Sequence, residues 1–197
     1  MTDKDLITHS NQLHKEASIL LNNEGLLPLL CRYGTTHVIG SYALNTMTWP
    51  DIDISIELPN PQDVDLFFEI GKTIASKFMI LKMSYSNHFI RNFANFDHGL
   101  YWGIQLKFAD TQWKIDVWGY DKQAFTTHMF EFNEFKSKLT QIDRTTILRI
   151  KHPISHRPDY RGDVYNSMAI YNAILQDKVS SLNEFKTWIE RNSNVNT

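Results

Sequence analysis

Four residues in the first third of the chain have the types and the spacing needed for phosphate and metal chemistry. Gly40 and Ser41 end an apolar run and predict a turn, and backbone N–H groups at such a turn attract anions. Asp51 and Asp53 follow in residues 51–57, where polar and apolar side chains alternate with the period of a half-buried strand. The two aspartates therefore share one face, with α-carbons about 6.6 Å apart. Carboxylates at this separation can hold two divalent ions about 3.5–4 Å apart.

A third carboxylate, Asp116, lies in residues 113–118, where its apolar neighbours again predict a strand. This strand follows an apolar stretch at 100–109, and the polar residues 110–112 between them predict an antiparallel hairpin. If the last two of those residues form the loop, Lys107 lies opposite Asp116 and the two form a cross-strand ion pair with no further role. Lys114 shares the strand face of Asp116, where it can touch a phosphate or offset local negative charge.

These three elements occur in the order of a known motif. Gly40-Ser41, Asp51-Ile52-Asp53 and Ile115-Asp116-Val117 together resemble the polymerase-beta-type nucleotidyltransferase superfamily, and the resemblance covers roughly residues 36–119. A further section, residues 157–175, resembles the helical tail of small bacterial members of this superfamily. The resemblance implies an α+β nucleotidyltransferase fold, in which a mixed sheet of five or six strands is flanked by helices and followed by a helical C-terminal subdomain.

The resemblance also implies a role for each motif residue. Ser41 and the Gly40 backbone would hold the terminal phosphates of a nucleoside triphosphate, ATP among the candidates. Asp51 and Asp53 would bind both of two Mg²⁺ ions, whereas Asp116 would ligate only the ion that activates the acceptor and could take the acceptor proton. The acceptor hydroxyl would attack the α-phosphorus and pyrophosphate would leave. Three carboxylates this close repel one another unless a cation lies between them.

Composition narrows the class of protein. The 197 residues are 42% hydrophobic with a formal net charge of -2, which suits a globular core and does not favour a general nucleic-acid binder. Cys31, the single cysteine, excludes an internal disulfide and is compatible with a reducing compartment. The sequence shows no secretory signal and no long apolar run, so a cytoplasmic protein without a membrane segment is expected.

Periodicity predicts the remaining elements. We expect a catalytic domain over residues 1–120 and a helical C-terminal subdomain over residues 121–197. Pro153 is expected to break the helix around it, which leaves a loop over residues 152–163. The expected strands cover residues 36–39, 52–58, 78–85, 88–93, 100–109 and 113–118, and the expected helices cover residues 4–22, 62–76, 121–150, 164–176 and 181–191.

Two functional hypotheses follow. The first is a magnesium-dependent nucleotidyltransferase that moves a nucleoside monophosphate onto a hydroxyl of a small molecule, a protein or an RNA. The second is a non-catalytic protein of the same fold that acts as a nucleotide-binding regulator or as an antitoxin-like partner. Retention of all three carboxylates favours the enzyme. Trp102, Trp113 and Trp118 are candidates for stacking on a base, although packing is the commoner role of tryptophan.

Overall fold

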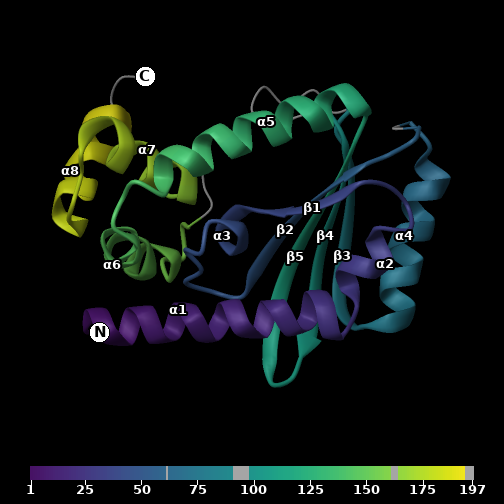
Figure 1. Ribbon diagram of the computed structural model, residues 1–197, viewed down its shortest axis with the longest axis horizontal. Helices are drawn as coiled ribbons and strands as arrows, with labels where there is room; N and C mark the ends of the chain where they lie inside the picture. The colour runs from purple at the N-terminus through teal and green to yellow at the C-terminus, as the bar shows by residue number, and fades with distance from the viewer. Residues whose placement is uncertain (61, 91–97, 161–163, 194–197) are drawn as a thin grey trace. The chain divides into compact units, whose positions relative to one another are not determined.

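The computed structural model describes residues 1–60, 62–90, 98–160 and 164–193 (Figure 1). The chain forms two compact units. The sheet unit comprises His14–Ala43 and Pro50–Asn133, and the helical unit comprises Met1–Leu13, Leu44–Trp49 and Glu134–Thr197. Two long helices, α1 (Asp3–Ser18) and α5 (Lys122–Leu139), contribute residues to both units. The domain boundary expected after residue 120 remains a prediction.

In the described residues, five strands form one mixed sheet in the order β1-β2-β5-β4-β3, which agrees with the predicted mixed sheet of five or six strands. The pair β2–β5 is parallel, whereas the pairs β1–β2, β5–β4 and β4–β3 are antiparallel. The register of the edge strand β3 shifts between Ile80 and Lys82. The strands are β1 (Thr36–Ile39), β2 (Asp51–Glu57), β3 (Met79–Asn87), β4 (Leu100–Phe108) and β5 (Thr111–Tyr120).

One face of this sheet is apolar and lies against α4 (Val64–Lys77). Trp102 on β4 is almost fully buried and donates its indole N–H to the Phe67 carbonyl of α4 at 2.9 Å. Gly71 makes the approach possible, because a Cβ there would lie only 2.8 Å from the Trp102 ring. Trp113 is fully buried on the same face. Neither tryptophan is therefore available to stack on a nucleobase.

Alternation along β2 and β5 leaves the opposite face to polar residues. Ile52, Ile54 and Ile56 are fully buried, so Asp51 and Asp53 point to the other side, as predicted. Asp116 lies on that same side because its neighbours Ile115 and Val117 are also buried. We refer to this surface as the carboxylate face.

The loop of the β4–β5 hairpin lies two residues earlier in the sequence than the loop at residues 111–112 that one interpretation of the sequence assumed. The two-residue loop is Ala109-Asp110, with Ala109 in the left-handed region at φ 51°, and the register places Lys107 opposite Gln112. Lys107 lies 4.0 Å from Asp110 instead. The proposed cross-strand ion pair between Lys107 and Asp116 is therefore wrong.

The elements before the sheet follow the predicted helix over residues 4–22 closely. After α1 the helix widens into a π-helical segment η1 (Ile19–Asn23), which buries Leu20 and Leu21. A short helix α2 (Leu26–Leu30) follows Gly25, which has a left-handed φ of 76°. The expected strand over residues 88–93 is a turn at residues 88–90, and the rest of it lies outside the described residues.

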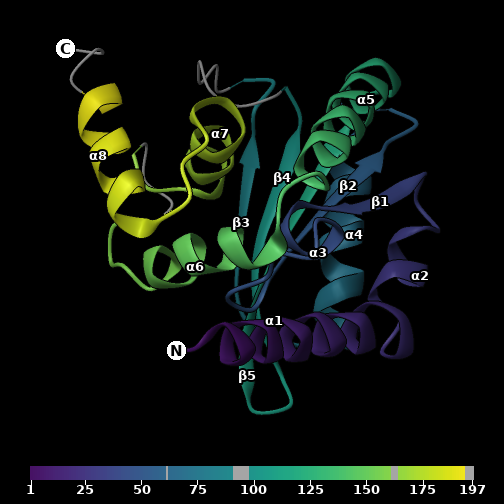
Figure 2. The same cartoon turned by 60° about the vertical axis from the view of Figure 1, so that its left-hand side comes forward.

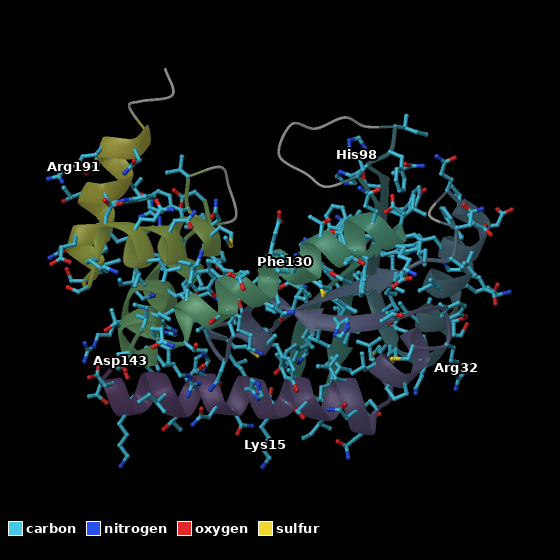
Figure 3. The ribbon with its side chains drawn as sticks, turned by 45° about the horizontal axis from the view of Figure 1, so that its top comes forward. Lys15, Arg32, His98, Phe130, Asp143 and Arg191 are labelled. Atoms are coloured by element: carbon cyan, nitrogen blue, oxygen red, sulfur yellow. The ribbon has the colours of Figure 1, made fainter. Side chains whose placement is uncertain are left out.

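The helical unit contains α6 (Arg144–Ser155), α7 (Ser167–Asp177) and α8 (Leu182–Ser193), which lie together in Figure 2. Asp143 precedes α6 (Figure 3) and accepts hydrogen bonds from the backbone N–H groups of Thr145 and Thr146 at 3.2 and 3.3 Å. The side chains that form the core of this unit include Ile147, Ile150, Ile154, Ile170, Ile174 and Phe185.

The prediction that Pro153 would break this helix is wrong, because α6 continues past Pro153 to Ser155. A proline removes one hydrogen bond of the ladder, but Ile150 and Ile154 on either side of it are buried in the core of the unit and hold the last turn in place. No helix in the described part of the chain is both long enough and apolar enough to cross a bilayer.

Candidate functional site

The parallel pairing of β2 with β5 brings the predicted carboxylates together. Asp53 and Asp116 are direct register partners on these strands, and adjacent strands lie about 4.8 Å apart. Asp51 is two residues before Asp53 on the same face and is the register partner of Lys114. The side chains of Asp51 and Asp116 are each only 14% exposed. The carboxylate face therefore holds three acidic groups from two neighbouring strands in a largely covered position.

The Gly40-Ser41 turn lies directly against the second of these carboxylates. Gly40 has a φ of 61°, in the region that glycine adopts without strain, and opens the short helix α3 (Gly40–Ala43). A Cβ on Gly40 would lie 2.8 Å from the Asp53 Cγ and closer still to the Asp53 carboxylate. Ser41 is 7% exposed and follows immediately. The predicted phosphate-binding turn is thus in contact with Asp53.

Tyr101 on β4 fixes the third carboxylate. Its hydroxyl donates a hydrogen bond to Asp116 Oδ1 at 2.8 Å. The path between them crosses Gly103, the register partner of Asp116, where a Cβ would lie 2.6 Å from the Tyr101 hydroxyl. A side chain at residue 103 would therefore separate Tyr101 from Asp116.

Burial and the negative charges of all three carboxylates raise the pKa of Tyr101. Burial raises this pKa far above its usual value, and the negative charges of Asp116, Asp51 and Asp53 raise it further, together with the hydrogen bond to Asp116. Each of the three charges acts on the same hydroxyl. Tyr101 consequently stays protonated and remains a hydrogen-bond donor throughout the pH range of ordinary assays.

A lysine supplies the positive charge within this cluster. Lys114 Nζ lies 3.6 Å from Asp51 Oδ1 and donates a hydrogen bond to Asp116 Oδ2. The Lys114 side chain is 22% exposed. Of its two predicted roles, the offset of local negative charge agrees with these contacts.

The donor set fits Mg²⁺ by its chemistry, because magnesium prefers carboxylate oxygens and is commonly held by one or two of them with substrate phosphates. The Gly40 turn lies directly against the Asp53 carboxylate, so the predicted phosphate-binding turn adjoins one of the candidate ligands. Within the described ranges, however, no three acidic, histidine or cysteine side chains enclose a metal position as they stand. The ammonium of Lys114 lies between Asp51 and Asp116, where a shared ion would have to bind.

Aromatic rings continue the carboxylate face beyond Asp116. The Trp118 ring is half-buried, and its centroid lies 4.8 Å from that of Tyr101 and 4.9 Å from that of His88. Trp118 is therefore the one of the three candidate tryptophans that lies on the side of the carboxylates.

Sequence reasoning missed Tyr101 and Gly103. Both look like ordinary strand residues as long as the register between β4 and β5 is unknown. Their role becomes visible once the register places Gly103 opposite Asp116. A two-residue loop at Ala109-Asp110 was the signal that could have fixed this register.

Comparison with known proteins gives structural matches only. No protein-family model and no curated protein sequence matches the chain. Among solved structures, the Cid1 poly(U) polymerase with Mg and 3'-dATP bound is 14% identical with a TM-score of 0.55, and the match covers 87% of this chain and 52% of that one.

Two further structures agree with this match. The poly(A) polymerase complex GLD-2–GLD-3 is 13% identical over 91% of this chain and 60% of that one, with a TM-score of 0.53. A cytoplasmic RNA terminal U-transferase is 14% identical over 87% and 53%, with a TM-score of 0.50. The chain thus spans little more than half the length of these proteins, and identities this low report on the fold. The chain therefore shares the fold of these nucleotide-transferring polymerases.

Proposed function

We propose that the protein is a magnesium-dependent nucleotidyltransferase that moves a nucleoside monophosphate from a triphosphate onto a hydroxyl. The observation that carries this proposal is the strand register that sets Asp53 opposite Asp116 with Asp51 on the same face, together with the Gly40 turn against Asp53. A fold alone does not define an activity, so the proposal rests on these side chains.

Each residue has a part in the proposed reaction. Gly40 and Ser41 bind the terminal phosphates through the turn, and Asp51 and Asp53 hold the triphosphate's cation. The acceptor oxygen forms a bond to the α-phosphorus while the bond from that phosphorus to the bridging oxygen breaks, and pyrophosphate leaves with that oxygen. Asp116 receives the acceptor proton, and the Tyr101 hydroxyl holds this carboxylate in place through Oδ1.

Bound magnesium would neutralise charge on the phosphates and lower the pKa of the acceptor hydroxyl. The protein's own contribution is mainly to position the reactants, which in phosphoryl transfer accounts for most of the acceleration. Tyr101 keeps Asp116 oriented toward the acceptor, and Gly40 keeps Asp53 close to the phosphate turn.

The acceptor is tested as three classes: an RNA 3' end, a small molecule and a protein hydroxyl. The matched structures are named as poly(U) and poly(A) polymerases and as a terminal U-transferase, which makes an RNA oligonucleotide the first acceptor to test. The near-neutral net charge of -2 gives no general preference for nucleic acid, so the other two classes stay in the panel.

Pyrophosphate release with each nucleoside triphosphate, Mg²⁺ and this acceptor panel tests the proposal. Asp53→Asn should lower the rate by at least ~100-fold, because it removes one preorganised charge from the reacting centre. Asp110→Asn is the matched control, since this exposed carboxylate lies in the loop of the β4–β5 hairpin. Equal rates in the two variants would refute the catalytic assignment.

The second hypothesis, a non-catalytic nucleotide-binding regulator or antitoxin-like partner, predicts a different result. A protein that binds nucleotide with Mg²⁺ should gain thermal stability in their presence. If that gain occurs without pyrophosphate release for any acceptor, the regulatory hypothesis replaces the enzyme.

A further inference from the structure

Lys114 occupies the position that a cation shared by Asp51 and Asp116 would need. It lies on β5 directly beside Asp51 of β2, because the two are register partners, and it points to the same face as Asp116 two residues later. Its ammonium lies 3.6 Å from Asp51 Oδ1 and contacts Asp116 Oδ2. One positive charge thus bridges two strands and two carboxylates.

Both oxygens of Asp116 accept a hydrogen bond from the protein. Oδ1 accepts from the Tyr101 hydroxyl, and Oδ2 accepts from the Lys114 ammonium. An ion that ligates Asp116 must replace one of these donors. Tyr101 is held by ring contacts with Trp118 and His88, whereas Lys114 has a flexible four-carbon stem. A metal ion that binds Asp116 therefore displaces Lys114 and not Tyr101.

The two metal-ion positions of the proposed enzyme differ in how strongly Lys114 competes with the ion. An ion that enters with the triphosphate is held by Asp53 as well as by Asp51, and Asp53 lies against the Gly40 turn with Asp116, not Lys114, as its register partner. An ion on the acceptor side needs Asp116 and meets the ammonium. Two positive charges a few ångströms apart repel strongly in a partly covered site.

We propose that Lys114 is a built-in counter-ion that competes with the acceptor-side metal ion, so that the site holds one divalent ion tightly with its nucleotide and a second only by displacing the ammonium. This inference rests on the proposed function, since it concerns the metal ions of that reaction. It adds to the expectation of two Mg²⁺ ions that the two bind with unequal affinity. Lys114 acts as a positioning residue because it meets the metal site rather than the reacting atoms.

Counting bound metal ions tests the inference directly. Mn²⁺ is titrated into the full chain with a non-hydrolysable nucleoside triphosphate analogue, and free Mn²⁺ is measured by electron paramagnetic resonance. The wild type should bind one ion tightly and a second weakly. In Lys114→Met the second ion should bind about tenfold more tightly or better, because the competing charge is gone. Lys107→Met is the matched control, since Lys107 lies in the same hairpin and pairs with the exposed Asp110.

Two further measurements keep the test independent of folding. Without metal, Lys114→Met should melt at a lower temperature than the wild type and gain more on addition of Mg²⁺, whereas Lys107→Met should behave like the wild type. Lys114→Arg preserves the charge and should bind ions as the wild type does.

The outcomes separate this inference from the proposed function. If the wild type and Lys114→Met bind two ions with the same affinities, the inference is overturned and the enzyme proposal stands. If neither protein binds Mn²⁺ with the nucleotide analogue, the proposed function fails and the inference fails with it.

Discussion

Replacement of Gly40 by alanine offers the sharpest test of the site geometry. Gly40→Ala should lower stability by about 1–2 kcal/mol, because an L residue is strained at a φ of 61°. For a chain of this length that corresponds to a fall in melting temperature of about 2–8 °C. The added Cβ would also lie 2.8 Å from the Asp53 Cγ. Carbon atoms in contact need 3.5–4.0 Å, so the carboxylate must retreat by about 1 Å.

This displacement of the Asp53 carboxylate should lower the catalytic activity. A misplacement of about 1 Å at a reacting centre can cost ~100-fold in rate, so kcat/KM for pyrophosphate release should fall by this order in Gly40→Ala. Gly25→Ala is the matched control: Gly25 has a φ of 76°, and its Cβ would meet only the end of the flexible Lys77 side chain.

The two variants share the backbone strain and differ only in the contact with Asp53. Both are expected to melt at lower temperature by similar amounts, while Gly25→Ala keeps its kcat/KM within a few-fold of the wild type. If Gly40→Ala retained the activity of Gly25→Ala, the contact between the turn and Asp53 would have no part in the reaction.

Two other predictions concern single side chains. Tyr101→Phe removes a hydrogen bond to a charged oxygen, worth about 1.5–3 kcal/mol, and should lower kcat/KM by about tenfold or more when pyrophosphate is measured near neutral pH. Because the pKa of Tyr101 is raised, the folded chain keeps a proton that the unfolded chain loses above pH 10. The free energy of unfolding of the wild type, measured in urea and compared with that of Tyr101→Phe, should therefore decline above pH 10. A difference between the two proteins that does not change with pH would contradict this. In the helical unit, burial lowers the pKa of His152 below 6.5, aided by the charges of His156, His9 and the N-terminus. As the pH falls, the unfolded chain binds this proton before the folded chain does, so the free energy of unfolding decreases as the pH falls through 6.5. In His152→Gln the same urea assay should show a smaller decrease. Parallel curves of unfolding free energy against pH for the two proteins would exclude His152 as the source of the decrease.

Sequence periodicity predicted which face each acidic side chain would take. Isoleucines on both sides of Asp53 and apolar residues on both sides of Asp116 leave little choice, because a one-residue slip would bury the carboxylates. These local patterns predicted the two strands that carry the carboxylates and the Gly40-Ser41 turn before them, which agree with the structure.

What periodicity could not supply was the pairing between distant strands. The register that places Asp53 beside Asp116 joins residues separated by α4, β3 and β4, and no local signal encodes it. The contacts of Tyr101 and Lys114 depend on that register. The error at Pro153 has the same origin, since burial of Ile150 and Ile154 outweighs a local helix-breaking signal.

The parallel pairing of β2 with β5 also has a consequence for the order of folding. Gly40 and Asp53 belong to consecutive elements, so their contact closes a short loop, whereas the pairing of Asp53 with Asp116 closes a loop that contains α4, β3 and β4. We therefore expect the pairing of Asp53 with Asp116 to form later than the contact of Gly40 with Asp53. Lys114 arrives on the same strand as Asp116, and the incoming strand thereby carries the charge that makes its own docking favourable.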